Sequence, residues 1–351
     1  MRFDDIWLTG TGGTLGERTP VADAVATGHY ESEAAESTGM VSVAQARLAP
    51  PEMAVIAGRQ AIKDAQEYGT VVDPGSLYLH SHGHFQGIDM WPAACWIAKE
   101  LLGPRVDGIP TTVSAWSNGS LASIDIAAAM LASRPALPSA LITLGDRFAP
   151  PTDRWHTSPG IVFGDGAAAA VLARGGGRLR LVSLVSETDT VLEGLSRGDE
   201  PFRTAPAELG DIRHRTRQFL ARGEISIRDV QTRSADRTRS VVARALADAE
   251  LEQEQIDWFV TPFVGSTLYR ESFVRPLGIT PRHDLHELGL TIGHLGAADQ
   301  IYALDHLLKA DLLAPGARVL VIGTGMGFTF SAAVFATDRS RPHERKEGTP
   351  S

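Results

Sequence analysis

The sequence predicts an α/β fold, because short apolar runs alternate along it with longer segments of helical periodicity. Three runs are typical of buried strands, at residues 77–80 (LYLH), 140–144 (ALITL) and 318–322 (RVLVI). Four segments carry apolar residues at helical spacing: 53–68, 119–133, 236–250 and 297–312. Each strand is followed by glycine, histidine or polar residues and then by a helix. This order favours a largely parallel or mixed sheet covered by helices.

Composition limits the classes of function. The 351 residues are 43% hydrophobic and 21% charged, which is typical of a globular protein with a sizeable core. The net charge of -9 disfavours binding to nucleic acid or to an anionic membrane. Cys95 is the single cysteine, so no intramolecular disulfide is possible. We find no signal-peptide pattern and no apolar run of about 18 residues, and therefore expect a cytoplasmic protein.

The chain divides into two halves near the glycine-rich segment 174–177 (RGGG), where one apolar run ends and a new strand pattern begins. We expect one unit over 1–175 and a second over 176–337. Residues 196–224 are rich in charge, arginine and proline, and are predicted to be an insertion or a mobile cover over the second half. Residues 338–351 have almost no apolar content and are expected to be a disordered tail.

Ser117 is a candidate nucleophile because it lies between a strand signal and the strongly helical run SIDIAAAML. At the start of a helix, unpaired backbone N–H groups and the helix dipole favour developing negative charge. That environment suits both a nucleophile and an oxyanion. On local grounds alone, however, serine and asparagine before a helix are more often only N-caps.

A series of motifs, in the same order and at similar spacing, resembles ketosynthase III proteins over residues 75–335. The matching segments are A-W-S-N-G at 115–119, P-A-A-C at 92–95, F-G-D-G-A at 163–167, I-D-W-F-V at 256–260, I-G-H-L-G-A-A at 292–298 and G-M-G-F-T at 325–329. The resemblance implies a thiolase-like duplicated fold in α-β-α-β-α layers, usually a homodimer. It places the nucleophile in the half 1–175 and the base in the half 176–337. It also makes Cys95 a buried structural residue rather than the nucleophile.

This sequence departs from the family at all three catalytic positions. Ser117 stands where the family has cysteine, Phe263 aligns with its histidine, and His294 aligns with its asparagine. The resemblance implies that the family's His and Asn side chains donate hydrogen bonds during decarboxylative condensation, and losing such a donor costs about 2.7–4 kcal/mol. Phe263 donates none, so we expect this condensation to be impaired unless His294 substitutes alone. His294 instead becomes the expected base for Ser117, and Asp299 is predicted to hold its ring in a catalytic triad. As alternatives, His294 is a polar residue at a strand end and Asp299 stabilises a helix dipole.

The resemblance also suggests the surroundings of the nucleophile. We expect the backbone N–H groups of Ser117 and Met326 to form the oxyanion hole, and Trp116 and Phe263 to line the substrate pocket. The spacing H-S-H-G-H over 80–84 allows a metal site on a strand, but the segment runs into a loop and the family uses no metal, so none is expected.

The donor is expected to be a phosphopantetheine thioester, on coenzyme A or on an acyl carrier protein, with no cofactor. The family's coenzyme A clamp, W-x-x-x-R-T-G, falls on residues 33–39, where both Trp and Arg are absent. A carrier-protein donor is therefore at least as plausible as coenzyme A.

We predict an acyltransferase of secondary metabolism, such as polyketide or antibiotic biosynthesis. It would move an acyl group through acyl-Ser117 to a hydroxyl or thiol acceptor, on a small molecule or a carrier. One alternative is a ketosynthase III-type enzyme that condenses a starter acyl unit with malonyl-carrier protein. A second is an inactive scaffold that directs a partner ketosynthase.

Overall fold

The computed structural model describes residues 1–204 and 212–338. The predicted disordered tail therefore lies, except for its first residue, outside the described part. Within that part, no helix is long and apolar enough to cross a membrane.

Most of the described strands belong to one mixed sheet, in the order β10-β9-β11-β12-β8-β1-β7-β6-β4-β5. Their bounds are β10 (His283–Asp284), β9 (Trp258–Val260), β11 (Arg318–Gly325), β12 (Thr329–Ala336), β8 (Leu179–Thr188), β1 (Trp7–Leu15), β7 (Gly166–Ala173), β6 (Ser139–Asp146), β4 (Leu77–Ser81) and β5 (Thr111–Val113). A separate antiparallel pair is formed by β2 (Glu17–Pro20) and β3 (Ser42–Gln45).

The sheet is built from two equivalent halves. Going outward from its middle, β1 pairs antiparallel with β7 and β7 with β6, then β6 pairs parallel with β4 and β4 with β5. The other half repeats this pattern through β8, β12, β11, β9 and β10. The halves are joined where Trp7 and Leu8 of β1 pair with Arg180 and Leu179 of β8. The predicted duplication is confirmed, and the proposed boundary at 175–176 falls in the connection between β7 and β8.

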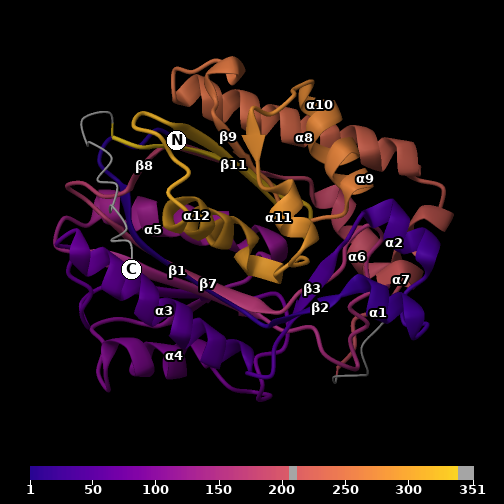
Figure 1. Cartoon of the computed structure of the whole chain (residues 1–351), viewed down its shortest axis with the longest axis horizontal. Coiled ribbons are helices and arrows are strands. Elements are labelled where there is room, and N and C mark those ends of the chain that lie inside the picture. Colours follow the sequence, from indigo (N-terminus) through magenta and orange to yellow (C-terminus); the bar gives the residue numbers. More distant parts are fainter. Residues whose placement is uncertain (205–211, 339–351) are drawn as a thin grey trace, which may run out of the picture.

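Helices complete the layers (Figure 1). Helices α3 (Pro50–Glu67) and α4 (Ala93–Leu102) cover one half of the sheet, and α8 (Ile227–Asp248) covers the other. Helices α5 (Gly119–Ser133) and α12 (Asp299–Lys309) lie between the halves. The remaining α-helices are α1 (Val21–Ala26), α2 (Ser32–Thr38), α6 (Gly194–Arg197), α7 (Ile212–Ala221), α9 (Ser266–Tyr269), α10 (Arg275–Leu277) and α11 (His286–Leu290).

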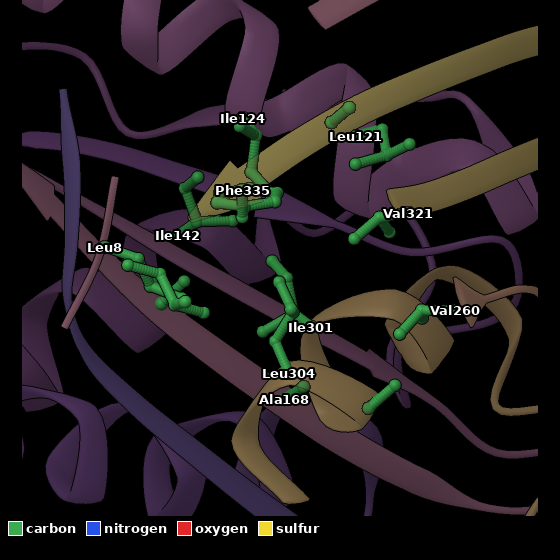
Figure 2. Close-up of a cluster of buried hydrophobic side chains, with 14 of the residues drawn as sticks. Leu8, Leu121, Ile124, Ile142, Ala168, Val260, Ile301, Leu304, Val321 and Phe335 are labelled. Carbon is green, nitrogen blue, oxygen red and sulfur yellow. The ribbon is translucent and has the colours of Figure 1, made fainter. Parts of the chain in front are cut away.

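The central core explains the continuous apolar runs in the sequence. Side chains of α5 and α12 meet the inner faces of both halves, as Figure 2 shows for Leu121, Ile124, Ile301 and Leu304. Along β7, Ala168, Ala170 and Leu172 face this inner core, and the alternate residues face α3. Because side chains alternate along a strand and both faces are covered, such a strand is apolar throughout.

The predicted elements are present, although several of their bounds differ from those expected. The helix expected over 236–250 begins at Ile227, where Ser226 and Asp229 form a capping box. The helix expected over 297–312 begins at Asp299, after a 3₁₀ turn over Gly296–Ala298. In the charged segment 196–224, the described part includes α7, whose Phe219 packs closely on Gly194.

Candidate active site

Ser117 lies on a tight turn between β5 and α5. The turn is a 3₁₀ helix over Trp116–Asn118, and α5 begins directly after it. Trp116 adopts a φ of 49°, which is uncommon for a residue other than glycine. The Trp116 ring packs over Gly83, where an added Cβ would lie 2.8 Å from its Cε3 atom. The turn therefore places a partly exposed serine at the N-terminus of a long buried helix.

Asn118 anchors this turn to the second half of the molecule. Its side chain is buried, and its Nδ2 donates hydrogen bonds to Thr329 Oγ1 (3.1 Å) and Ser331 Oγ (2.9 Å) on β12. The Ser331 hydroxyl also bonds Ser186 on β8, at 2.9 Å. No sequence pattern indicates this anchor, because it joins residues more than 200 positions apart.

His294 is fixed by the F-G-D-G segment of the first half. Its N–H donates to Val162 O (2.8 Å), and its carbonyl accepts from Gly164 N–H (2.9 Å). A Cβ on Gly164 would lie 2.3 Å from Ile292 O, so only glycine permits this approach. Asp165 of the same motif forms a buried ion pair with Arg154, at 3.1 Å. The motif thus positions the histidine-bearing segment.

The structure brings Ser117, His294 and Asp299 together. Ser117 Oγ lies 2.6 Å from His294 Nε2, and His294 Nδ1 lies 2.5 Å from Asp299 Oδ2. Both His294 and Asp299 are buried. The Asp299 carboxylate also accepts backbone N–H bonds from Leu295 (2.7 Å) and Phe263 (2.8 Å). These contacts orient the carboxylate toward the ring.

This arrangement defines the proton positions. A carboxylate accepts only, so Nδ1 of His294 carries the hydrogen and Nε2 presents a lone pair to the Ser117 hydroxyl. An imidazole held in this tautomer can take the hydroxyl proton as the oxygen attacks an acyl carbon. This is the geometry that a serine nucleophile requires, and the catalytic role of Ser117 stays a prediction.

The Gly325–Met326 turn lies beside the nucleophile. It connects β11 to β12, and Phe328 N–H closes it on Gly325 O at 2.8 Å. A Cβ on Gly325 would lie 2.3 Å from Ala115 O and 2.8 Å from Asn118 N, so this turn packs directly on the serine segment. The Met326 N–H and the Ser117 N–H thus belong to adjacent segments, and their joint role as an oxyanion hole remains a prediction.

Phe263 takes part through its backbone. Its ring is 3% exposed and packs against Gly289 and Tyr302 in the central core. Its N–H holds Asp299, a contribution that the sequence did not suggest. Pocket lining by the Phe263 and Trp116 rings stays a prediction.

The three histidines of the H-x-H-x-H segment each have protein partners. His80 bonds Thr143 (3.0 Å) and Gln86 (3.1 Å), His82 bonds the His84 carbonyl (2.9 Å), and His84 bonds Thr152 (2.6 Å). Burial, together with the nearby His82, lowers the pKa of His80 to about 4. Within residues 1–204 and 212–338, no group of three His, Cys, Asp or Glu side chains has a metal-binding arrangement.

Asp146 is a second buried carboxylate near the site. It accepts N–H bonds from Gly83 and His84 in the loop after β4, and from Ala297 in the turn before Asp299. Burial raises its pKa, although these N–H donors oppose the effect. Its place at the end of an apolar strand was the only sequence signal for it.

Two sequence-predicted features, the loop before F-G-D-G and Cys95, lie outside the triad. The loop before F-G-D-G packs on the segment before α2, where the rings of Trp155 and Tyr30 lie 5.0 Å apart and His156 bonds Glu31 at 2.7 Å. The expectation that Cys95 is buried was wrong, because this residue is exposed on α4.

The chain is similar to known proteins in both sequence and structure. Residues 112–190 match 3-oxoacyl-[acyl-carrier-protein] synthase III, and residues 246–337 match the C-terminal domain of the same enzyme. The structure of ChlB3, described as an acyltransferase, has a TM-score of 0.85 and 32% identity, over 95% of this chain and 98% of that chain.

Two further solved structures share the fold at lower identity. FabH from Pseudomonas aeruginosa has a TM-score of 0.73 at 18% identity, over 97% of this chain and 100% of that chain. A variant of OleA from Xanthomonas campestris has a TM-score of 0.72 at 18% identity, over 96% and 99% of the two chains.

Proposed function

The chain belongs to the 3-oxoacyl-[acyl-carrier-protein] synthase III-like, thiolase-fold family and is an acyltransferase, and we propose that it works through an acyl group on Ser117. The observation that carries the proposal is the hydrogen-bonded chain from Ser117 through His294 to Asp299. Its donors are thioesters of phosphopantetheine, on an acyl carrier protein or on coenzyme A, and it needs no cofactor.

In the first half-reaction, Ser117 Oγ attacks the thioester carbonyl while His294 Nε2 takes its proton. The carbon–sulfur bond breaks, and the proton passes from Nε2 to the departing thiolate. An oxyester on Ser117 and a free pantetheine thiol result. Asp299 stabilises the transient imidazolium and does not itself take the proton.

In the second half-reaction, an acceptor hydroxyl or thiol attacks the acyl-serine carbonyl, and Nε2 again takes the proton. The Ser117 oxygen leaves and recovers that proton. The oxyanion of both steps lies at the N-terminus of α5, where the N–H groups of Ser117 and Met326 are the proposed donors.

The site favours simple transfer over condensation. Condensation requires donors that stabilise a malonyl enolate, but His294 Nε2 is engaged with Ser117, and the Phe263 side chain has no polar atom. A decayed scaffold would not retain three paired polar groups in this geometry. These contacts and the family membership support simple acyl transfer, and the similarity to ChlB3 is the support for a role in secondary metabolism, including polyketide or antibiotic biosynthesis.

We also propose a homodimer that acts in the cytoplasm. Strand β5 is one of the two edge strands of the sheet, and Thr111 and Thr112 on it are exposed. The loop after β4 exposes Phe85, Ile88 and Met90, by 51%, 59% and 105%. An unpaired edge strand near exposed apolar side chains fits a second copy of this chain.

Intact-protein mass spectrometry tests the proposal. Wild type, Ser117→Ala and His294→Ala are incubated with a panel of acyl-coenzyme A and acyl-carrier-protein donors. We expect an acyl mass increment on wild type, slower loading in His294→Ala, and none in Ser117→Ala. An equal increment on Ser117→Ala would disprove the acyl-serine mechanism.

A further inference from the structure

Gln300 is a fully buried amide beside the triad. It follows Asp299 on α12, it is 0% exposed, and its Oε1 has no hydrogen-bond partner among the described residues. Buried polar atoms without partners are rare, because each loses its bonds to water and gains none. Such an exception calls for a specific reason.

The other end of the amide reaches the nucleophile. Its Nε2 lies 3.3 Å from the carbonyl oxygen of Ser117 and 3.4 Å from that of Ile322 on β11. Both hydrogen bonds are long, so they add little stability. They nevertheless restrain the peptide that follows Ser117.

The first two residues of α12 therefore contact the two groups of the proposed reaction, the His294 ring and the Ser117 main chain. Asp299 fixes the ring of His294, and Gln300 fixes the main chain of Ser117. Ser117 and His294 lie 177 positions apart, yet their reacting atoms are 2.6 Å apart. One helix end thus sets the distance between nucleophile and base.

The serine turn needs such a restraint, because the preceding Trp116 has a positive φ of 49°. A residue in that region persists only where its surroundings hold it. Asn118 holds the turn from the side of β12, and Gln300 holds it from the side of α12.

We propose that Gln300 is a positioning residue, retained at a cost in stability because it holds Ser117 in line with His294. The inference rests on the acyl-serine mechanism. It predicts that replacing the amide slows acylation without weakening the fold, the opposite of what a purely structural residue would show.

The test compares wild type, Gln300→Met and Thr11→Val, using p-nitrophenyl acetate as the acylating probe. Methionine has nearly the volume of glutamine but no amide. Thr11 on β1 is also buried with an unpartnered hydroxyl, but none of its hydrogen bonds involves the triad, so its isosteric replacement is a matched control. The burst of p-nitrophenolate gives the acylation rate constant, and urea unfolding gives the stability.

For Gln300→Met we expect an acylation rate constant roughly 10- to 100-fold lower, an unchanged dissociation constant of the probe from the acylation phase, and an unfolding midpoint equal to or above that of wild type. Thr11→Val should keep the wild-type burst, with a midpoint that is also not lowered. A full-speed burst in Gln300→Met, or a lowered midpoint together with a slow burst, would overturn the positioning role alone. A wild type without a Ser117-dependent burst would overturn the proposed mechanism and this inference with it.

Discussion

Asp299 receives three hydrogen bonds on one carboxylate, and this residue fixes the tautomer of His294. Asp299→Asn keeps the size of the side chain but turns one oxygen into an N–H donor. A donor facing Nδ1 moves the ring hydrogen to Nε2, where it blocks proton transfer from Ser117. We expect acylation to fall on the order of 10³- to 10⁴-fold. Rapid-quench mass spectrometry, with an acyl donor that acylates the wild type, measures the acylation rate of the variant. A rate within a factor of ten of the wild-type rate would contradict the triad.

His80 makes a pH prediction that concerns stability. Its folded pKa of about 4 lies below the value of about 6.5 for an exposed histidine. Between these values the unfolded chain binds a proton that the folded chain does not, so stability falls as the pH falls from about 6.5 toward 4. Between pH 7 and pH 5 we expect His80 to account for about 2 kcal/mol of that loss.

His80→Gln removes the titrating ring while keeping hydrogen-bonding atoms for Gln86 and Thr143. Urea unfolding at pH 7 and pH 5 should show a smaller loss of stability in the variant than in wild type. Asp146 titrates in both proteins, so its opposite contribution cancels in the comparison. Equal losses would show that His80 is not the cause.

Single residues also show what the sequence could predict. The contacts of Ser117 with His294 and of His294 with Asp299 were predictable, because each residue has a local signal or a motif position. Asn118, Asp146 and Gln300 were not singled out, because their contacts join segments remote in the chain. Phe263 contributes a backbone N–H, which no side-chain pattern can reveal.

At the level of elements, the side chain of Asn118 attaches the turn over Trp116–Asn118 to β12 through two hydrogen bonds. Asn118→Ala removes both bonds of Nδ2 and leaves Thr329 and Ser331 with fewer partners. We expect a loss of about 2 kcal/mol in unfolding free energy and at least tenfold slower acylation.

Ser226→Ala is the matched control for this loss of stability. It removes the capping box of α8 and should cost about 1 kcal/mol in unfolding free energy with no change in acylation. If Ser226→Ala slowed acylation as Asn118→Ala does, general destabilisation would explain both results.

The observed bounds of helices and strands agree with the apolar pattern only where the whole element is buried. The strand pattern at 140–144 extended to β6 (Ser139–Asp146), whose buried residues end in Asp146. The start of α8 was missed because its first two turns hold only two apolar residues, Ile227 and Val230, and the helix begins at the Ser226 cap.

At the level of the whole molecule, duplication supplies the two sides of the site. Ser117 comes from the first half, and His294 and Asp299 come from the second, so the proposed reaction depends on how the halves meet at α5 and α12. The matching strand order of the two halves could be predicted mainly through the resemblance. The sequence has no short tandem repeat, and only a helix pair and glycine-marked strand ends in each half fit a diverged duplication.

The proposed dimer is tested at this scale by sedimentation equilibrium. Thr112→Pro removes an N–H from the edge strand β5, and Met90→Lys places a charge among the exposed apolar residues. Both should shift a wild-type dimer toward monomer. Val191→Lys, at another exposed apolar position (51% exposed), should leave the dimer intact. A monomeric wild type would contradict the proposal.

The most direct test of the account is the position of the acyl group. After incubation with a donor that loads the protein, tryptic digestion separates Ser117, in the peptide 106–147, from the exposed Cys95, in the peptide 64–99. Tandem mass spectrometry then locates the adduct. The account predicts an acyl group on Ser117, whereas an adduct on Cys95 with an unmodified Ser117 would contradict it.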